Sequence, residues 1–302
     1  MERNITLDFF KIFLSILVIT IHVEVKLAET HPLWNWFISQ GIARIAVPCF
    51  FIINGYYLAK KIEDFSAVKK YVLHLLTIYI TWFVFYILFY DRKIDYANLL
   101  QNFLLSSSSH LWYVVSLIYG CILLFVLKKG IKNDHVLLII ALLLFSGGVV
   151  WEGMRGNVCN GLFMGFPFVF CGYYIRSKDI ISKIKDIYLI PSIILCFMVL
   201  LIESYLGFRA YIAHNIYIVL IVLCPLIIIF VFKHSTYKFS NSYLMNISSM
   251  ASAIYFIHPF AILMLINGEY PNTLVRFAIV CLLSFILSIF IIYINKYVKI
   301  FL

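Results

Sequence analysis

The stretch that decides the fold is LDFFKIFLSILVITIH, which runs from Leu7 to His22. It is apolar except for a few polar side chains at regular intervals. Each residue of an α-helix advances by about 100° and about 1.5 Å, so four of these side chains fall within about 60° of one another: Asp8, Lys11, Ser15 and His22. Lys11 and His22 lie about three turns, or about 16 Å, apart on one line. The stretch predicts a membrane helix whose polar face lies against a protein interior.

The whole chain has the composition of a membrane protein. Of its 302 residues, 64% are hydrophobic and 13% are charged, and the mean hydropathy is +0.99. A soluble domain could not bury that much apolar surface. Runs of about 20 apolar residues can cross a bilayer, and such runs recur at roughly residues 5–25, 40–59, 70–90, 111–128, 135–151, 158–176, 187–206, 212–232, 245–267 and 274–296. The sequence predicts an all-α, polytopic integral membrane bundle of about ten transmembrane helices, in a single domain over residues 1–302.

Basic residues concentrate in alternate loops. With a cytoplasmic N-terminus, the outer segments hold few of them: Lys26, Arg44, Arg92, Lys93, Arg155, Arg209 and Arg276. This asymmetry predicts that both termini are cytoplasmic and that the chain lies in a bacterial cytoplasmic membrane. The net charge of +10 is then explained by topology and by anionic lipid, so no nucleic-acid partner is expected. The seven cysteines show no metal-ligand spacing, so no metal is expected.

Under this topology, polar residues from several runs gather in the outer half of the membrane: His22, Arg44, His110, Trp112, Tyr113, Glu152, Arg155, Asn157 and Asn160, with His258 near the middle of the ninth run. Each has a purely structural alternative that the sequence leaves open. The two arginines can anchor helix ends, and Glu152 can pair with Arg155. The two aromatic residues suit an interface belt. A histidine before Pro259 can cap a broken helix, and Asp8 and Lys11 can lie at the inner interface.

Five stretches resemble the membrane acyltransferase 3 family. The first is Leu7–His22, with its Leu-Asp, a basic residue and a histidine eleven residues later, although the basic residue is Lys11 where the family usually has arginine. The others are ARIAVPCFFIINGYYL (Ala43–Leu58), HLWYVVSLIYG (His110–Gly120), WEGMRGNVCNGLFMGFPFVFCGYYI (Trp151–Ile175) and YFIHPF (Tyr255–Phe260). Asn54 stands where the family often has serine. Together they cover most of the chain, and their order matches the family.

The resemblance implies an O-acyltransferase. Its donor would be acyl-CoA, most simply acetyl-CoA, and its acceptor a hydroxyl group of an extracytoplasmic glycan or small molecule. The implied catalytic residues are His22, Lys11 and Asp8, with His22 as general base or transient acyl carrier. Basic residues would attract the CoA phosphates: Lys11, Lys69 and Lys70. Acceptor or oxyanion roles fall to Arg44, Trp112, Tyr113, Glu152, Arg155 and His258.

Two other interpretations remain open. The same polar residues could line the path of a small-solute transporter, which a Pro-broken helix and midplane histidines would also suit. The chain could also be the membrane part of a racemase of the serine-racemase type, which belongs to the same family. The acceptor, the acyl chain and the oligomeric state are not indicated by the sequence.

Overall fold

The protein is a set of long apolar helices with one short sheet. The structure, a computed structural model, describes residues 2–23, 32–89, 109–154, 156–239, 242–265, 268 and 273–302. Eight helices in these residues are long and apolar enough to cross a membrane. The chain is therefore a multi-pass integral membrane protein, as predicted.

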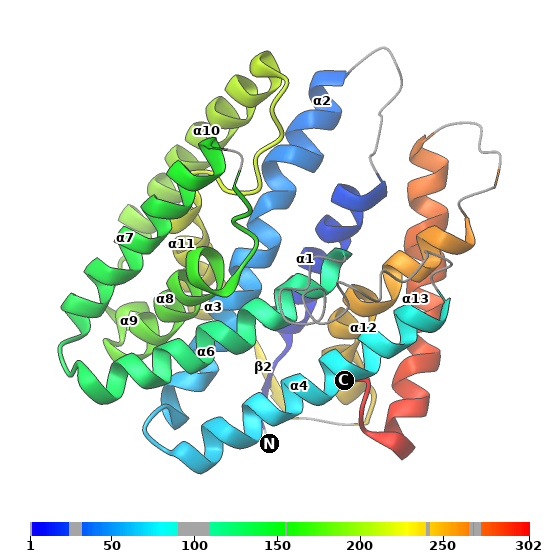
Figure 1. Ribbon diagram of the computed structural model, residues 1–302, viewed down its shortest axis with the longest axis horizontal. Coiled ribbons are helices and arrows are strands. Elements are labelled where there is room, and N and C mark those ends of the chain that lie inside the picture. Colours follow the sequence, from blue (N-terminus) through cyan, green and yellow to red (C-terminus); the bar gives the residue numbers. More distant parts are fainter. Residues whose placement is uncertain are drawn as a thin grey trace. The chain divides into compact units, whose positions relative to one another are not determined.

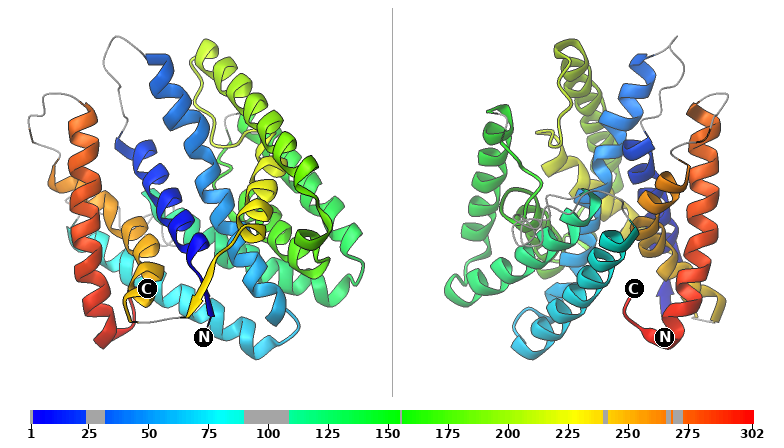
Figure 2. Two further views of the ribbon diagram at one scale, coloured as in Figure 1. Left: turned by 180° about the vertical axis from the view of Figure 1, so that it is seen from behind. Right: turned by 45° about the vertical axis from the view of Figure 1, so that its right-hand side comes forward.

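The chain forms two compact units (Figures 1 and 2). Unit 1 comprises residues 1–50, 180–300 and 302, and unit 2 comprises residues 51–179 and 301. The expectation of a single domain over residues 1–302 stays a prediction. The elements of unit 1 are β1 (Glu2–Asn4), α1 (Ile5–Val23), α2 (Pro32–Trp36), η1 (Phe37–Gly41), η2 (Ile42–Ile45), the start of α3 (Ala46–Leu58), α9 (Ile180–Lys183), α10 (Asp186–Ala210), α11 (Leu220–Lys233), β2 (Tyr237–Phe239), α12 (Ser242–Met264) and α13 (Thr273–Val298). Those of unit 2 are the rest of α3, η3 (Ala59–Lys61), α4 (Phe65–Phe89), η5 (Ser109–Leu111), α6 (Trp112–Gly130), α7 (Asp134–Gly153), η6 (Gly161–Gly165) and α8 (Phe166–Ser177).

Two of the ten predicted runs form shorter helices than expected. Run 158–176 becomes helical only at Gly161, because the Asn160 side chain caps that end by accepting hydrogen bonds from two backbone N–H groups. Run 212–232 becomes helical only at Leu220, which leaves a helix of 14 residues. Eight long spans are thus observed, and the count of ten stays a prediction.

Helix α1 is the centre of unit 1. It packs against α11, α12, α13 and the η1–η2 segment. Its first turn is capped by Asn4, whose Oδ1 accepts from the backbone N–H of Leu7 at 2.9 Å. Strands β1 and β2 pair antiparallel directly before this cap, with Asn4 opposite Tyr237. The start of α1 is therefore fixed both by its own cap and by a segment more than 200 residues away.

In unit 2, α3 and α8 cross with their backbones in close contact. A Cβ atom added at Gly55 would fall well inside 3.0 Å of the Val169 carbonyl, and one at Gly172 equally close to the Ile52 carbonyl. Small residues allow this approach, which membrane helices use for association. The two glycines make the crossing possible.

We expect Gly172→Leu to destabilise the protein by about 3 kcal/mol or more, because backbone atoms cannot move aside as a flexible side chain can. Thermal unfolding of the protein in detergent measures the effect. Gly130→Leu is the matched control, since a Cβ atom at Gly130 has no heavy atom within 4 Å. Equal melting temperatures for the two variants would contradict the close crossing.

A buried carboxylate joins three helix ends in the same unit. Asp134, at the start of α7, contacts the Nζ atoms of Lys128 and Lys178, each at 2.7 Å, and accepts from the Tyr173 hydroxyl at 3.0 Å. The hydrogen bond to Asp134 raises the pKa of Lys178. The cluster fixes the ends of α6, α7 and α8 to one another.

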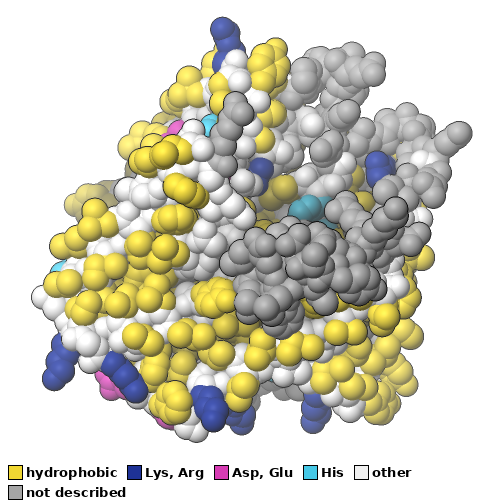
Figure 3. Space-filling view, in the orientation of Figure 1, with side chains coloured by type: hydrophobic (Ala, Val, Ile, Leu, Met, Phe, Trp, Pro, Cys, Tyr) yellow, Lys and Arg dark blue, Asp and Glu magenta, His cyan; other side chains and the backbone are white. Residues whose placement is uncertain are grey.

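The surface matches a membrane environment. Hydrophobic side chains cover much of the described surface in the space-filling view, while Lys and Arg side chains are sparse and lie mainly at its edges (Figure 3). Helix α10 shows this most strongly. Only 17% of the residues in its 18-residue apolar segment are buried, the smallest share among the eight spans. These apolar faces are expected to contact lipid.

Candidate functional site

The polar face of α1 lies against α12. Ser15 Oγ donates to the carbonyl oxygen of Ala251 at 2.8 Å, and the rings of His22 and His258 lie 5.2 Å apart, centroid to centroid. From the first contact to the second, the chain moves seven residues forward on α1 and seven forward on α12, about two turns on each. The two helices therefore run parallel along this face. The periodic polar face of the sequence thus becomes a contact between two helices of unit 1 that ends in a pair of histidines.

The backbone around Pro259 determines the protonation pattern of His258. Proline has no N–H, so the carbonyl of Tyr255, four residues earlier, loses its usual helical donor. His258 Nδ1 lies 2.7 Å from that carbonyl oxygen. Because a carbonyl only accepts, Nδ1 must carry the proton, and the lone pair of the neutral ring is on Nε2. The Tyr-x-x-His-Pro sequence therefore produces a histidine of fixed tautomer.

The two histidines differ in accessibility. His258 is fully buried, with 0% of its surface exposed, whereas His22 is exposed. Of the two rings, His22 is therefore the one with side-chain surface outside the protein packing. His258 lies beside it, held by α12. The arrangement matches a reactive residue with a positioning residue next to it.

Arg44 brings a positive charge to the same site. It lies in η2, which packs against α1, the helix that carries His22. Its guanidinium donates to Asn215 Oδ1 at 3.0 Å and to Gln40 Oε1. These two amides orient the guanidinium on the segment that packs against α1.

At the other end of the face, Asp8 and Lys11 form an ion pair. Lys11 Nζ lies 3.4 Å from Asp8 Oδ1. Asp8 is buried, with 5% of its surface exposed, and Lys11 is half-buried. The pair lies at the start of α1, about three turns from His22.

The candidates in unit 2 have other surroundings. Tyr113 is buried, and its hydroxyl accepts from Asn54 Nδ2 at 3.0 Å. Asn54 Oδ1 in turn accepts from the Tyr71 hydroxyl at 2.5 Å. This chain of hydrogen bonds joins α3, α4 and α6, which is a structural role for Tyr113. Trp112 is half-buried against Phe51, with ring centroids 6.3 Å apart.

The remaining candidates lie at helix ends. Glu152 is half-buried in the last turn of α7, and Lys69 and Lys70 are exposed in the second turn of α4. Arg155 lies outside the described residues. Among the residues that the structure describes, no three His, Cys, Asp or Glu side chains are grouped as metal ligands. The absence of a metal stays a prediction.

Sequence reasoning missed three contributors to the site. Gln40 lies one helical turn before Arg44, so its spacing was a usable signal. The carbonyl of Tyr255 was also predictable, because Pro259 follows it by four residues. Asn215 is 171 residues from Arg44 in the chain and gives no local signal.

The curated relatives that the chain matches are named as racemases. An amino-acid racemase of Enterococcus faecalis is 25% identical to it, over 93% of this chain and 45% of the relative. A serine/alanine racemase of Enterococcus gallinarum is 27% identical, over 86% of this chain and 41% of the relative. The chain thus spans less than half the length of these relatives. No solved structure matches it.

A family model described as an acyltransferase domain matches residues 4–293. The match includes both units and every residue of the polar face of α1. Since it covers nearly the whole chain, the protein belongs to the acyltransferase 3 family.

Proposed function

We propose that this protein transfers an acyl group, in the simplest case acetyl, from acyl-CoA to a hydroxyl group of an extracytoplasmic acceptor such as a cell-surface glycan. The observation that carries the proposal is the pair of an exposed His22 and a buried His258, 5.2 Å apart, in a chain that belongs to the acyltransferase 3 family. Acyl transfer needs a base near neutral pH, which histidine supplies.

In the proposed reaction, His22 removes the proton of the acceptor hydroxyl. The oxygen attacks the thioester carbonyl, a C–O bond forms and the C–S bond breaks. The CoA sulfur leaves and takes the proton from the His22 imidazolium. In the variant pathway, a His22 nitrogen attacks the thioester carbonyl, the C–S bond breaks, and the CoA sulfur leaves with the imidazole proton. The acceptor hydroxyl then attacks the acyl-imidazole, the C–N bond breaks, and the hydroxyl proton returns to His22. The buried His258 ring packs beside the His22 imidazole and helps to position it.

Arg44 stabilises the negative charge that develops on the thioester oxygen. The side-chain amides of Gln40 and Asn215, which accept hydrogen bonds from the guanidinium, keep it oriented. A positioned cation of this kind lowers the barrier most where water is excluded. Roles of Trp112 and Glu152 in acceptor binding, with Arg155, are part of the same proposal.

The donor enters from the cytoplasmic side, where we place both termini and the basic loops. Lys11, with Asp8 as its partner, lines the path of the pantetheine arm towards His22. Lys69 and Lys70 attract the CoA phosphates, since they are exposed at the start of α4. The two shorter helices, η6–α8 and α11, complete a set of ten crossings.

A second candidate function is transport of a small amino acid. It is favoured by the alignment of this chain with proteins named as amino-acid and serine/alanine racemases. In that case His22, His258 and Arg44 would bind a solute instead of activating a hydroxyl. The two functions differ in whether acyl-CoA is consumed.

Inside-out membrane vesicles containing the protein test the proposal. They are given acetyl-CoA labelled in the acetyl group and loaded with a hydroxyl-bearing glycan extract. We expect release of free CoA outside and label on the enclosed glycan, with neither in vesicles that lack the protein. If CoA release stays at background for acetyl and longer acyl donors while serine accumulates, the transport function replaces the enzyme.

A further inference from the structure

We propose that unit 1 has a binding site for an anionic phospholipid at the junction of α9, α10 and α11. A pocket of about 340 Å³ lies there. Its lining combines cationic, hydroxyl and apolar side chains: Lys183, Ile184, Lys185, Tyr188, Leu189, Ser192 and Leu226. The site is separate from the His22 pair and does not depend on the proposed acyl transfer.

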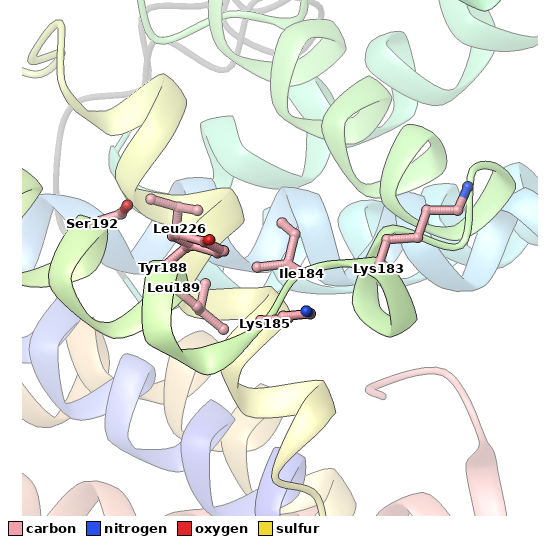
Figure 4. A pocket seen from close by; sticks show the side chains of 7 residues that line it. All are labelled: Lys183, Ile184, Lys185, Tyr188, Leu189, Ser192 and Leu226. Carbon is pink, nitrogen blue, oxygen red and sulfur yellow. The ribbon is translucent and has the colours of Figure 1, made fainter.

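The lysines and the apolar side chains differ in how they lie around the pocket. In Figure 4 the side chains of Tyr188, Leu189 and Leu226 lie close together, with Ser192 beside them, whereas the Lys183 side chain extends away from them. Lys185 lies near Ile184, between these groups. A ligand that fits this arrangement has a negatively charged head and an apolar chain.

Lys185 supplies a positive charge to the pocket. Within the described residues, Lys185 is exposed and has no ion-pair partner. Asp186, the carboxylate in the first turn of α10, is already engaged, because Lys233 Nζ lies 2.8 Å and His234 Nε2 3.5 Å from its Oδ1. Lys233 also donates to the carbonyl of Ile184 at 2.7 Å, which fixes α11 to the turn before α10. The Lys185 side chain therefore extends from a segment that these contacts hold in place.

The apolar end of the pocket continues onto a lipid-facing surface. Lys185, Tyr188, Leu189 and Ser192 follow each other at intervals that place them on one side of α10. Further along the same side, seven residues after Tyr188, Leu195 is 58% exposed. An acyl chain that leaves the pocket can therefore lie along α10.

The position of the pocket selects a lipid over a free phosphate compound. It lies at the first turns of a membrane-spanning helix, where phospholipid headgroups meet the protein. Basic side chains there attract anionic lipid by about 1 kcal/mol each. A free phosphate would use the lysines and leave the apolar end of the pocket uncovered.

Native mass spectrometry of the purified protein in detergent tests the site. Phosphatidylglycerol is titrated against phosphatidylcholine with the same acyl chains. We expect tighter binding of phosphatidylglycerol, and an affinity about fivefold weaker in Lys185→Gln, as removal of one lysine predicts. Lys132→Gln is the matched control, an exposed lysine of unit 2, and should bind as the wild type does.

Two further measurements distinguish a bound lipid from a free phosphate compound. Ser192→Phe fills the apolar end while leaving the lysines in place, and it should weaken phosphatidylglycerol binding as well. Inorganic phosphate and CoA at millimolar concentration should not displace the lipid. Equal lipid affinity in Lys185→Gln and Lys132→Gln, or full displacement by inorganic phosphate, would overturn the proposal.

Discussion

His22→Ala is expected to lower the rate of CoA release from acetyl-CoA by at least about 100-fold, because loss of a general base typically costs 10² to 10⁴ in rate. The exposed His22 is the member of the pair with side-chain surface outside the protein packing. The rate is measured in the inside-out vesicles described above, at equal amounts of folded protein. A transient acyl-histidine would be lost in the same variant, so its detection in quenched wild-type protein separates the two pathways.

His74→Ala is the matched control for this variant. His74 lies on an exposed face of α4, so its removal also deletes a histidine from a membrane helix. We expect its activity to stay within about twofold of the wild type, since surface substitutions have small effects. Comparable losses in both variants would assign the effect to general damage and would remove His22 from the reaction.

Pro259→Ala is expected to lower activity by about tenfold or more without lowering thermal stability. The alanine N–H becomes available to the Tyr255 carbonyl, which then no longer serves His258 Nδ1 alone. The His258 tautomer is released, as in active sites where loss of the orienting partner leaves a histidine in the wrong form. The helix itself gains a hydrogen bond, so its stability should be equal or higher.

The control for this prediction is Pro225→Ala in α11. Pro225 also interrupts a membrane helix, but Ile221 supplies the carbonyl four residues earlier, and Cys224, not a histidine, precedes the proline. We expect this variant to keep its activity and to unfold at the same or a higher temperature. Nitrogen-15 NMR spectra of the histidines report the tautomer directly. A wild-type rate in Pro259→Ala would exclude a positioning role for the fixed tautomer.

The polar face of α1 was predictable from the sequence, because it depends only on the spacing of residues within one helix. The spacing of Asp8, Lys11 and His22 predicted one polar face, and the structure has Asp8 and Lys11 as an ion pair on that face. The spacing did not identify the partner of this face, because the contact of His22 with His258 joins residues 236 positions apart. Such pairing depends on how α1 and α12 pack, which no local rule determines.

The ends of the helices and some side-chain partners were less predictable. Apolar runs predicted helices correctly, but the hydropathy of run 158–176 gave no indication that Asn160 would start the helix three residues late. Tyr113 stays a candidate for an acceptor or oxyanion role. Its hydroxyl accepts from Asn54, which lies 59 residues away in the chain, so this contact gave no local signal.

The pairing of β1 with β2 has a consequence for how this family diverges. The pairs Glu2–Phe239 and Arg3–Lys238 are joined through backbone groups, which every residue except proline supplies. Substitutions can therefore accumulate in both strands while the register, and with it the axial position of α1, stays the same. Related proteins should therefore keep the histidine of their first helix at the same axial position, even where the sequences of these two strands share no identity. A proline at Arg3 or Lys238 should be rare, because it removes a backbone N–H from the pairing.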